Sequence, residues 1–160
     1  MPLEYEDIHH LRAAQGYVEL GMYEDAIAEL GEIDSEHSDL DEVIAVKIAI
    51  HGGQKDWKSM RDEAKKMFER DPANPQWVIS LAYATRRAQT IEDAKTILLD
   101  AVEKHPDEAM IRYNLACYEC QLGELDAAKE YLDQAFSLEP KCRTIAREDS
   151  DLEALWGELE

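Results

Sequence analysis

The sequence predicts an all-α protein: a solenoid of stacked helical hairpins forming one domain over residues 1–160. Three observations predict this. Pro72, Pro106 and Pro140 stand 34 residues apart, and a fixed period of this length is typical of repeat arrays. Between these prolines lie amphipathic segments with apolar residues at helical spacing. Glycine or proline punctuates the junctions, so we expect hairpins that bury their apolar sides by stacking on neighbours.

The bulk composition bounds the class of protein. The 160 residues are 45% hydrophobic and 33% charged, with a net charge of -19, which predicts a folded and acidic domain. This charge disfavours nucleic acid and anionic membranes as partners. We expect no secretory signal and no transmembrane segment, since the start lacks a basic and apolar stretch and no run of 18 apolar residues occurs. Three cysteines fit reduced thiols, so we expect a cytoplasmic protein.

Four hairpins are expected, at residues 7–40, 41–74, 75–108 and 109–142. The last shows the repeat pattern most completely, as a large and a small residue, a glycine turn, four further apolar positions and a proline: Leu115, Ala116, Gly123, Leu125, Ala128, Leu132, Ala135 and Pro140. This pattern resembles the tetratricopeptide repeat (TPR), whose period is 34 residues. The resemblance covers residues 7–142 and implies a right-handed α-solenoid of four TPR hairpins.

The hairpin at residues 41–74 departs most from the TPR pattern. It has Met60 where a small residue is usual and Ala64 where a large one is usual, which we interpret as a volume-conserving exchange. Lys47 stands at an apolar position, so the register of the first helix stays open. Elsewhere Gln89 replaces the turn glycine and Ser38 replaces the proline.

Residues 143–160 do not form a fifth repeat. Ser150 and Glu153 match a capping box that opens a last helix, with Leu152, Leu155, Trp156 and Leu159 on its apolar side. We interpret this segment as a cap on the last hairpin, because terminal elements of solenoids cover an exposed edge. The alternative is that Trp156 forms a dimer contact, so we expect a monomer or a weak homodimer.

The TPR resemblance also implies a binding face, because the first helices of TPR hairpins line a concave groove. The positions that would bind a peptide are Arg12, Gln15, Gln76, Ile79, Tyr83, Arg86, Arg87, Met110, Tyr113, Asn114, Cys117 and Gln121. The same register adds Ile8, Leu11, Val18, Glu19, Glu42, Ala45, Val46, Ala49, Gly52, Gly53, Ser80 and Cys120.

Two pairs of groove residues keep alternative interpretations. Arg86 and Arg87 would pair with a ligand carboxylate, or with nearby acids such as Glu92. Tyr83 and Tyr113 would stack on ligand side chains or close the groove between helices. The Lys and Asn set with which some TPR proteins clamp the acidic tail of heat-shock chaperones is not reproduced here.

Charge is uneven along the chain, and no catalytic pattern is evident. Residues 1–40 carry eleven acidic side chains and one basic one, which either keeps the end of the stack soluble or steers a basic partner. Cys117 and Cys120 form a Cys-x-x-Cys without a second cysteine pair, and His9 and His10 lack a third ligand. We therefore expect no metal, no cofactor and no enzymatic activity.

The function predicted from the sequence is a scaffold or adaptor that holds a protein or peptide segment along the concave face. The first alternative is a small acidic chaperone of the secretion type, which keeps a client soluble. A regulatory subunit of an enzyme is the next alternative. The sequence does not identify the partner.

Overall fold

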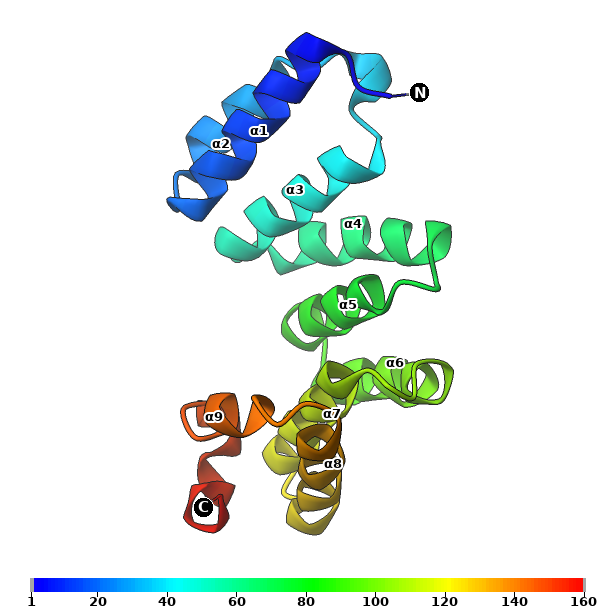
Figure 1. Cartoon of the computed structure of the whole chain (residues 1–160), viewed down its shortest axis with the longest axis vertical. Helices are drawn as coiled ribbons and strands as arrows, with labels where there is room; N and C mark the ends of the chain where they lie inside the picture. The colour runs from blue at the N-terminus through cyan, green and yellow to red at the C-terminus, as the bar shows by residue number, and fades with distance from the viewer. Residues whose placement is uncertain (1, 160) are drawn as a thin grey trace. The chain divides into compact units, whose positions relative to one another are not determined.

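A computed structural model describes residues 2–159, and within that range the chain consists of helices and connecting turns with no strand (Figure 1). Its residue contacts divide it into two compact units. Unit 1 ends at Pro72 and unit 2 begins at Ala73. The all-α class is the one that the sequence predicts.

Unit 1 contains two helical hairpins. Its elements are α1 (Tyr5–Glu19), α2 (Tyr23–Gly31), the short 3₁₀ helix η1 (Ser35–His37), α3 (Asp41–Gly53) and α4 (Trp57–Arg70). Gly21 ends the first hairpin helix with a φ of 71°, a left-handed conformation that glycine adopts without steric cost. Helix α1 packs on both α2 and α3, and the core between them is apolar: Leu11, Ala14, Ala26, Ile33, Val43, Val46 and Ile50.

The divergent hairpin of α3 and α4 keeps the repeat fold by exchanging large and small residues. Met60 and Ala64 are both buried. The missing side chain of Gly52 makes room for Met60, because a Cβ at Gly52 would lie 3.3 Å from the Met60 sulfur. Lys47 is accommodated at its apolar position because its Nζ donates to the Ser38 carbonyl at 2.9 Å. This hairpin therefore tolerates its departures through local compensation.

Unit 2 contains two further hairpins and a C-terminal segment. Its elements are α5 (Pro75–Ala88), α6 (Ile91–Lys104), α7 (Ala109–Gln121), α8 (Leu125–Leu138), α9 (Cys142–Ala146) and the 3₁₀ helix η2 (Ser150–Glu158). Asn74 and Thr90 accept backbone N–H groups at the starts of α5 and α6, and Pro75 stands in the first turn of α5. Gly123 turns α7 into α8 with a φ of 84°.

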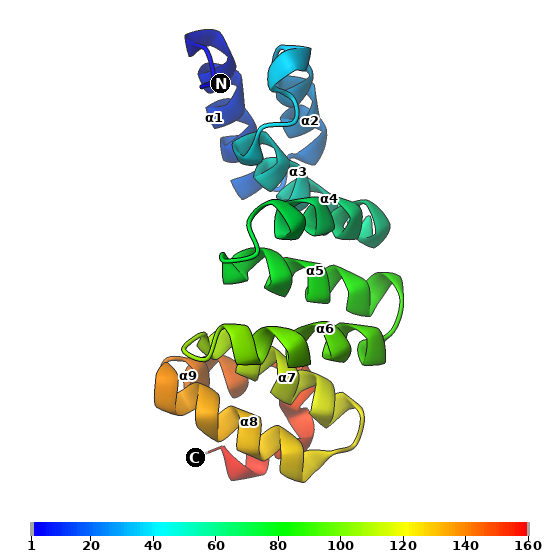
Figure 2. The same ribbon diagram turned by 90° about the vertical axis from the view of Figure 1, so that its right-hand side faces the viewer.

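The C-terminal segment returns along α7, and we call residues 147–159 the tail. Figures 1 and 2 show it in orange and red beside α7 and α8, and η2 packs on α7. The predicted capping box is wrong in detail, since the side chain of Asp149, not Ser150, caps the helix by accepting the Asp151 N–H. The helix is 3₁₀ over its length, and three residues per turn place Leu152 and Leu155 on one face, where both are buried.

Candidate functional site

The first helices of unit 1 leave an open groove between α1 and α3. This α1–α3 groove has a volume of about 360 Å³ and six lining residues: Gln15, Val18, Glu19, Ala45, Val46 and Ala49. All six stand at positions that the repeat register assigns to a binding face. The structure therefore brings together, within one unit, the predicted groove residues of two consecutive first helices.

The α1–α3 groove combines an apolar floor with an acidic rim. Val46 is buried and Val18 and Ala45 are half-buried, whereas Glu19 and Ala49 are exposed. Among residues 2–159, Glu19 forms no ion pair, so its carboxylate faces solvent at the edge of the apolar floor. Small side chains at residues 45 and 49 leave space above the floor. This arrangement suits an apolar side chain that enters the groove beside a cationic one.

In unit 2 the corresponding positions of α5 and α7 contact the chain's own tail. The Arg86 guanidinium donates through Nη1 and Nη2 to the two carboxylate oxygens of Asp151, at 2.5 and 2.9 Å. The Tyr113 hydroxyl donates to Asp149 Oδ2 at 2.8 Å, and Gln121 Nε2 donates to the Asp151 carbonyl at 2.9 Å. We call Arg86, Tyr113, Cys117 and Gln121 the tail site. All four are among the residues predicted to line the groove.

Burial and pairing change the protonation equilibria of the tail site. The hydrogen bonds from Arg86 lower the pKa of Asp151, and the same contact raises the pKa of Arg86. Burial, with the hydrogen bond to Asp149, raises the pKa of Tyr113. Burial also raises the pKa of the Cys117 thiol, whose Sγ lies 3.7 Å from Asp149. At neutral pH the site is therefore cationic at Arg86 and neutral at its other groups.

Both arginines have contacts within the chain that the sequence did not point to. Arg86 pairs with Asp151, 65 residues away, and not with Glu92. The Arg87 guanidinium lies 3.8 Å from the centre of the Tyr83 ring, a cation–π contact on a ring that is 39% exposed. Of the remaining candidates, Gln76 and Arg12 are exposed. The half-buried ones are Ile79, Met110 and Asn114.

Cys117, Asp149 and Asp151 offer ligand atoms within 4.8 Å of one another, a spacing that a metal ion could bridge. Their existing contacts oppose a cation there. Asp151 is paired with the Arg86 guanidinium, which would repel an incoming metal ion, and Asp149 accepts the Tyr113 hydroxyl. The carboxylates of Asp149 and Asp151 therefore act as hydrogen-bond acceptors for Tyr113 and Arg86, and not as metal ligands.

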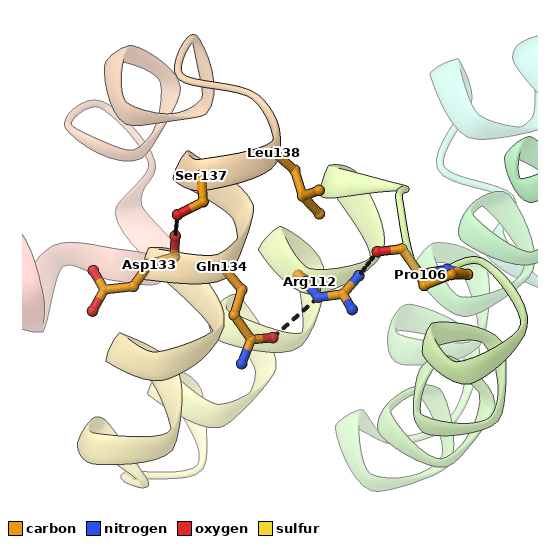
Figure 3. A pocket seen from close by; sticks show the side chains of 6 residues that line it. All are labelled: Pro106, Arg112, Asp133, Gln134, Ser137 and Leu138. Atoms are coloured by element: carbon orange, nitrogen blue, oxygen red, sulfur yellow. Dashed lines mark hydrogen bonds between the residues drawn. The ribbon is translucent and has the colours of Figure 1, made fainter.

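A second hollow of about 510 Å³ lies where the turn before α7 approaches α8 (Figure 3). Arg112 stands at its centre, and its Nη1 donates to the Pro106 carbonyl at 2.6 Å while its Nε donates to Gln134 at 3.0 Å. These two bonds tie the turn before α7 to α8. Since they use the guanidinium internally, we assign Arg112 a structural role.

A buried ion pair in unit 1 was missed by the sequence analysis. Asp7, in the first turn of α1, lies 2.5 Å from Nδ1 of His37 and also accepts the Asp34 N–H at 3.1 Å. Both side chains are buried, so the pair fastens η1 to the start of α1. The two residues are 30 positions apart and follow no repeat pattern, so no local signal in the sequence points to the pair.

Comparisons with known proteins support the fold. No protein-family model and no curated protein matches the chain. Among solved structures, it is similar to TTC0263, a thermophilic TPR protein of Thermus thermophilus, with a TM-score of 0.73 and 21% identity over 96% of this chain and 82% of that one. It is also similar to a double mutant of MamA from RS-1, with a TM-score of 0.72 and 16% identity over 86% and 78% of the two chains. MamA from MSR-1 gives a TM-score of 0.66 and 15% identity over 98% and 88%.

These comparisons and the helical architecture show that the chain has the fold of TPR proteins. The fold class predicted from the 34-residue period is thereby confirmed. No helix in the described part of the chain is long and apolar enough to cross a membrane.

Proposed function

We propose that this protein is a binding scaffold in which the α1–α3 groove of unit 1 holds a segment of a protein partner. The observation that carries the proposal is the open groove of about 360 Å³ between α1 and α3, whose six lining residues all stand at predicted groove positions. Pre-formed grooves with an apolar floor and few polar groups are the usual setting for peptide recognition.

The partner segment that fits this groove is apolar on one side and basic at its edges. Val18, Ala45 and Val46 offer apolar surface with space for a medium-sized side chain such as Leu. Glu19 lines the groove, Glu42 is exposed at the start of α3, and neither forms an ion pair among residues 2–159. Residues 1–40 carry eleven acidic side chains and one basic one. Lys or Arg beside the apolar anchor would therefore gain from this field.

The proposed role requires no chemistry at the groove. Of its six lining residues, Glu19 is the one titratable group, so the lining supplies no nucleophile with an adjacent base. The three cysteines of the chain are unpaired and buried, which fits a reducing compartment. We accordingly place this scaffold in the cytoplasm.

The test uses two labelled helical peptides with Leu at positions i and i+4, one flanked by Lys and the other by Glu. Fluorescence anisotropy at physiological salt, about 0.15 M, should show binding of the Lys peptide alone. Ala49→Arg fills the groove and adds a like charge, so it should weaken binding at least about tenfold. Ala28→Arg makes the same change on an exposed position of α2 and should leave binding unchanged.

Two results would contradict the proposal. One is equal binding of the Lys and Glu peptides, which would show that the acidic rim has no role. The other is an Ala49→Arg protein that is folded by circular dichroism and still binds the Lys peptide as the wild type does. In that case the α1–α3 groove is not the binding face.

A further inference from the structure

The tail site of unit 2 is built like a receptor for carboxylates. Three side chains from two first helices, Arg86, Tyr113 and Gln121, donate four hydrogen bonds to Asp149 and Asp151 of the tail. The paired oxygens of Asp151 meet the planar fork of Arg86, the geometry that distinguishes a carboxylate from other polar groups. The tail site therefore binds two acidic residues that are separated by one other residue, an Asp-x-Asp pattern.

The arginine of this site is held in place by its surroundings. The Arg86 side chain is 16% exposed, and its guanidinium lies 5.6 Å from the centre of the Tyr118 ring. Burial and nearby Cys117 raise the pKa of Tyr118 to about 12, so this ring is neutral and offers Arg86 its face. A partly desolvated arginine needs an anionic partner, because leaving it unpaired at this burial is costly. Any segment that occupies the tail site must therefore place a carboxylate against Arg86.

The tail that now supplies the carboxylates has features of a replaceable occupant. Most of it is the nine-residue 3₁₀ helix η2, a form whose hydrogen-bond geometry is poorer than that of an α-helix and which is uncommon at this length. Trp156 is 38% exposed and its indole N–H bonds within the C-terminal segment, to the Ala146 and Asp149 carbonyls. The tail is held on α5, α7 and α8 by buried Leu152 and Leu155, by the bonds of Asp149 and Asp151 to the tail site, and by the Lys129–Glu158 ion pair at 2.7 Å.

We propose that the tail site is a second binding site, for an acidic partner segment with an Asp-x-Asp pattern followed by apolar residues, and that the tail occupies it as an intramolecular ligand. A partner segment of this chemistry replaces the tail by making the same bonds to Arg86, Tyr113 and Gln121. Since the tail is tethered, its effective concentration at the tail site is high. A partner segment must therefore have a higher affinity or be present at a higher concentration to replace it. This site has the opposite charge preference to the α1–α3 groove, and its existence does not depend on the function proposed for that groove.

The experiment measures binding of a peptide copy of the tail to the full-length chain. The probe is the fluorescein-labelled peptide REDSDLEALFGEL, which reproduces residues 147–159 with phenylalanine in place of Trp156. The Asp149→Asn/Asp151→Asn chain has a weakened internal occupant. It should bind the probe at least about tenfold more tightly than wild type does, and adding Arg86→Gln should remove that gain.

Two controls separate recognition from general attraction. The same peptide with asparagine at both aspartate positions should bind at least about tenfold more weakly. Arg61→Gln, which removes an equal charge from α4 of unit 1, should leave binding of the probe unchanged. In wild type, saturating probe should increase hydrogen–deuterium exchange across Ser150–Glu158 while α7 keeps its protection.

The proposal is overturned if the probe fails to bind the Asp149→Asn/Asp151→Asn chain although circular dichroism shows it folded. It is equally overturned if that chain, wild type and the Arg86→Gln variant bind the probe alike. Exchange in the tail that does not change at saturating probe shows that the peptide binds elsewhere, and this too contradicts replacement.

Discussion

Unit 1 leaves the groove positions of its first helices open, whereas unit 2 covers the corresponding positions of α7 with its own tail. In unit 1, Val18, Ala45 and Ala49 line a groove of about 360 Å³. In unit 2, Tyr113 and Cys117 stand at matching repeat positions but are buried under residues beyond the last hairpin. The same register thus yields an accessible face or an occupied one, depending on whether a later segment of the chain packs over it.

Removing a buried side chain of the tail, which covers α7 in unit 2, should have the largest effect on the free energy of unfolding. Leu155→Ala removes a fully buried side chain of η2, the element that packs on α7, and we expect a loss of about 2–5 kcal/mol in the free energy of unfolding measured with urea. Leu138→Ala is the matched control, since Leu138 is exposed on α8. Equal and small losses for both variants would show that the tail does not pack on α7 as described.

The contact between Gly53 of α3 and Tyr23 of α2, in unit 1, offers the next largest effect. A Cβ at Gly53 would lie 2.1 Å from the ring of Tyr23, so Gly53→Ala displaces this ring from its packing between α2 and α3. We expect a destabilisation of about 1–3 kcal/mol in urea unfolding, the usual cost of overpacking.

Gly16→Ala provides the contrast to Gly53→Ala within the same unit. Gly16 lies inside α1 and a Cβ there would meet no atom within 4 Å, so the change should stabilise the chain by about 0.5–1 kcal/mol. If both substitutions stabilise the chain, the close approach of Tyr23 to Gly53 is not present in solution.

The hairpins were predictable from the sequence because each repeats a local pattern of large, small and turn residues. The α1–α3 groove was predictable for the same reason, as Val18 and Ala49 follow from their repeat positions. The cover of unit 2 was not, because the Arg86–Asp151 pair spans 65 residues and the tail lies outside the period. A signal was present in hindsight: an Asp-x-Asp pair beside apolar residues, in a chain whose predicted groove contains Arg86.

Unit 1 should also respond to pH through the buried pair of Asp7 and His37. Their hydrogen bond raises the pKa of His37 above its ordinary 6.5 and lowers the pKa of Asp7 below its ordinary 3.8. The contribution of the pair is therefore full between pH 3.8 and 6.5. It declines as pH rises through the raised pKa of His37, and again as pH falls through the lowered pKa of Asp7.

The pH prediction is checked by thermal unfolding of wild type and His37→Gln. The wild-type Tm should fall more steeply than that of His37→Gln as pH rises above 6.5. His10, paired with Glu29, has a pKa raised by that hydrogen bond and so the same sign of effect, but both proteins retain it. Parallel Tm profiles for the two proteins would contradict a stabilising role for the Asp7–His37 pair.

The difference between the open and the covered face is tested most directly by the reactivity of one thiol in each. In a chain with Cys120→Ser and Cys142→Ser, the native Cys117 reports on unit 2. In a chain that also carries Cys117→Ser and Ala49→Cys, the introduced thiol reports on the α1–α3 groove. Because Cys117 is 3% exposed and its pKa is raised by burial, its alkylation should be at least about tenfold slower than that of the thiol introduced at residue 49. The two rates should converge in urea, and equal rates in the native proteins would show that the tail does not cover unit 2.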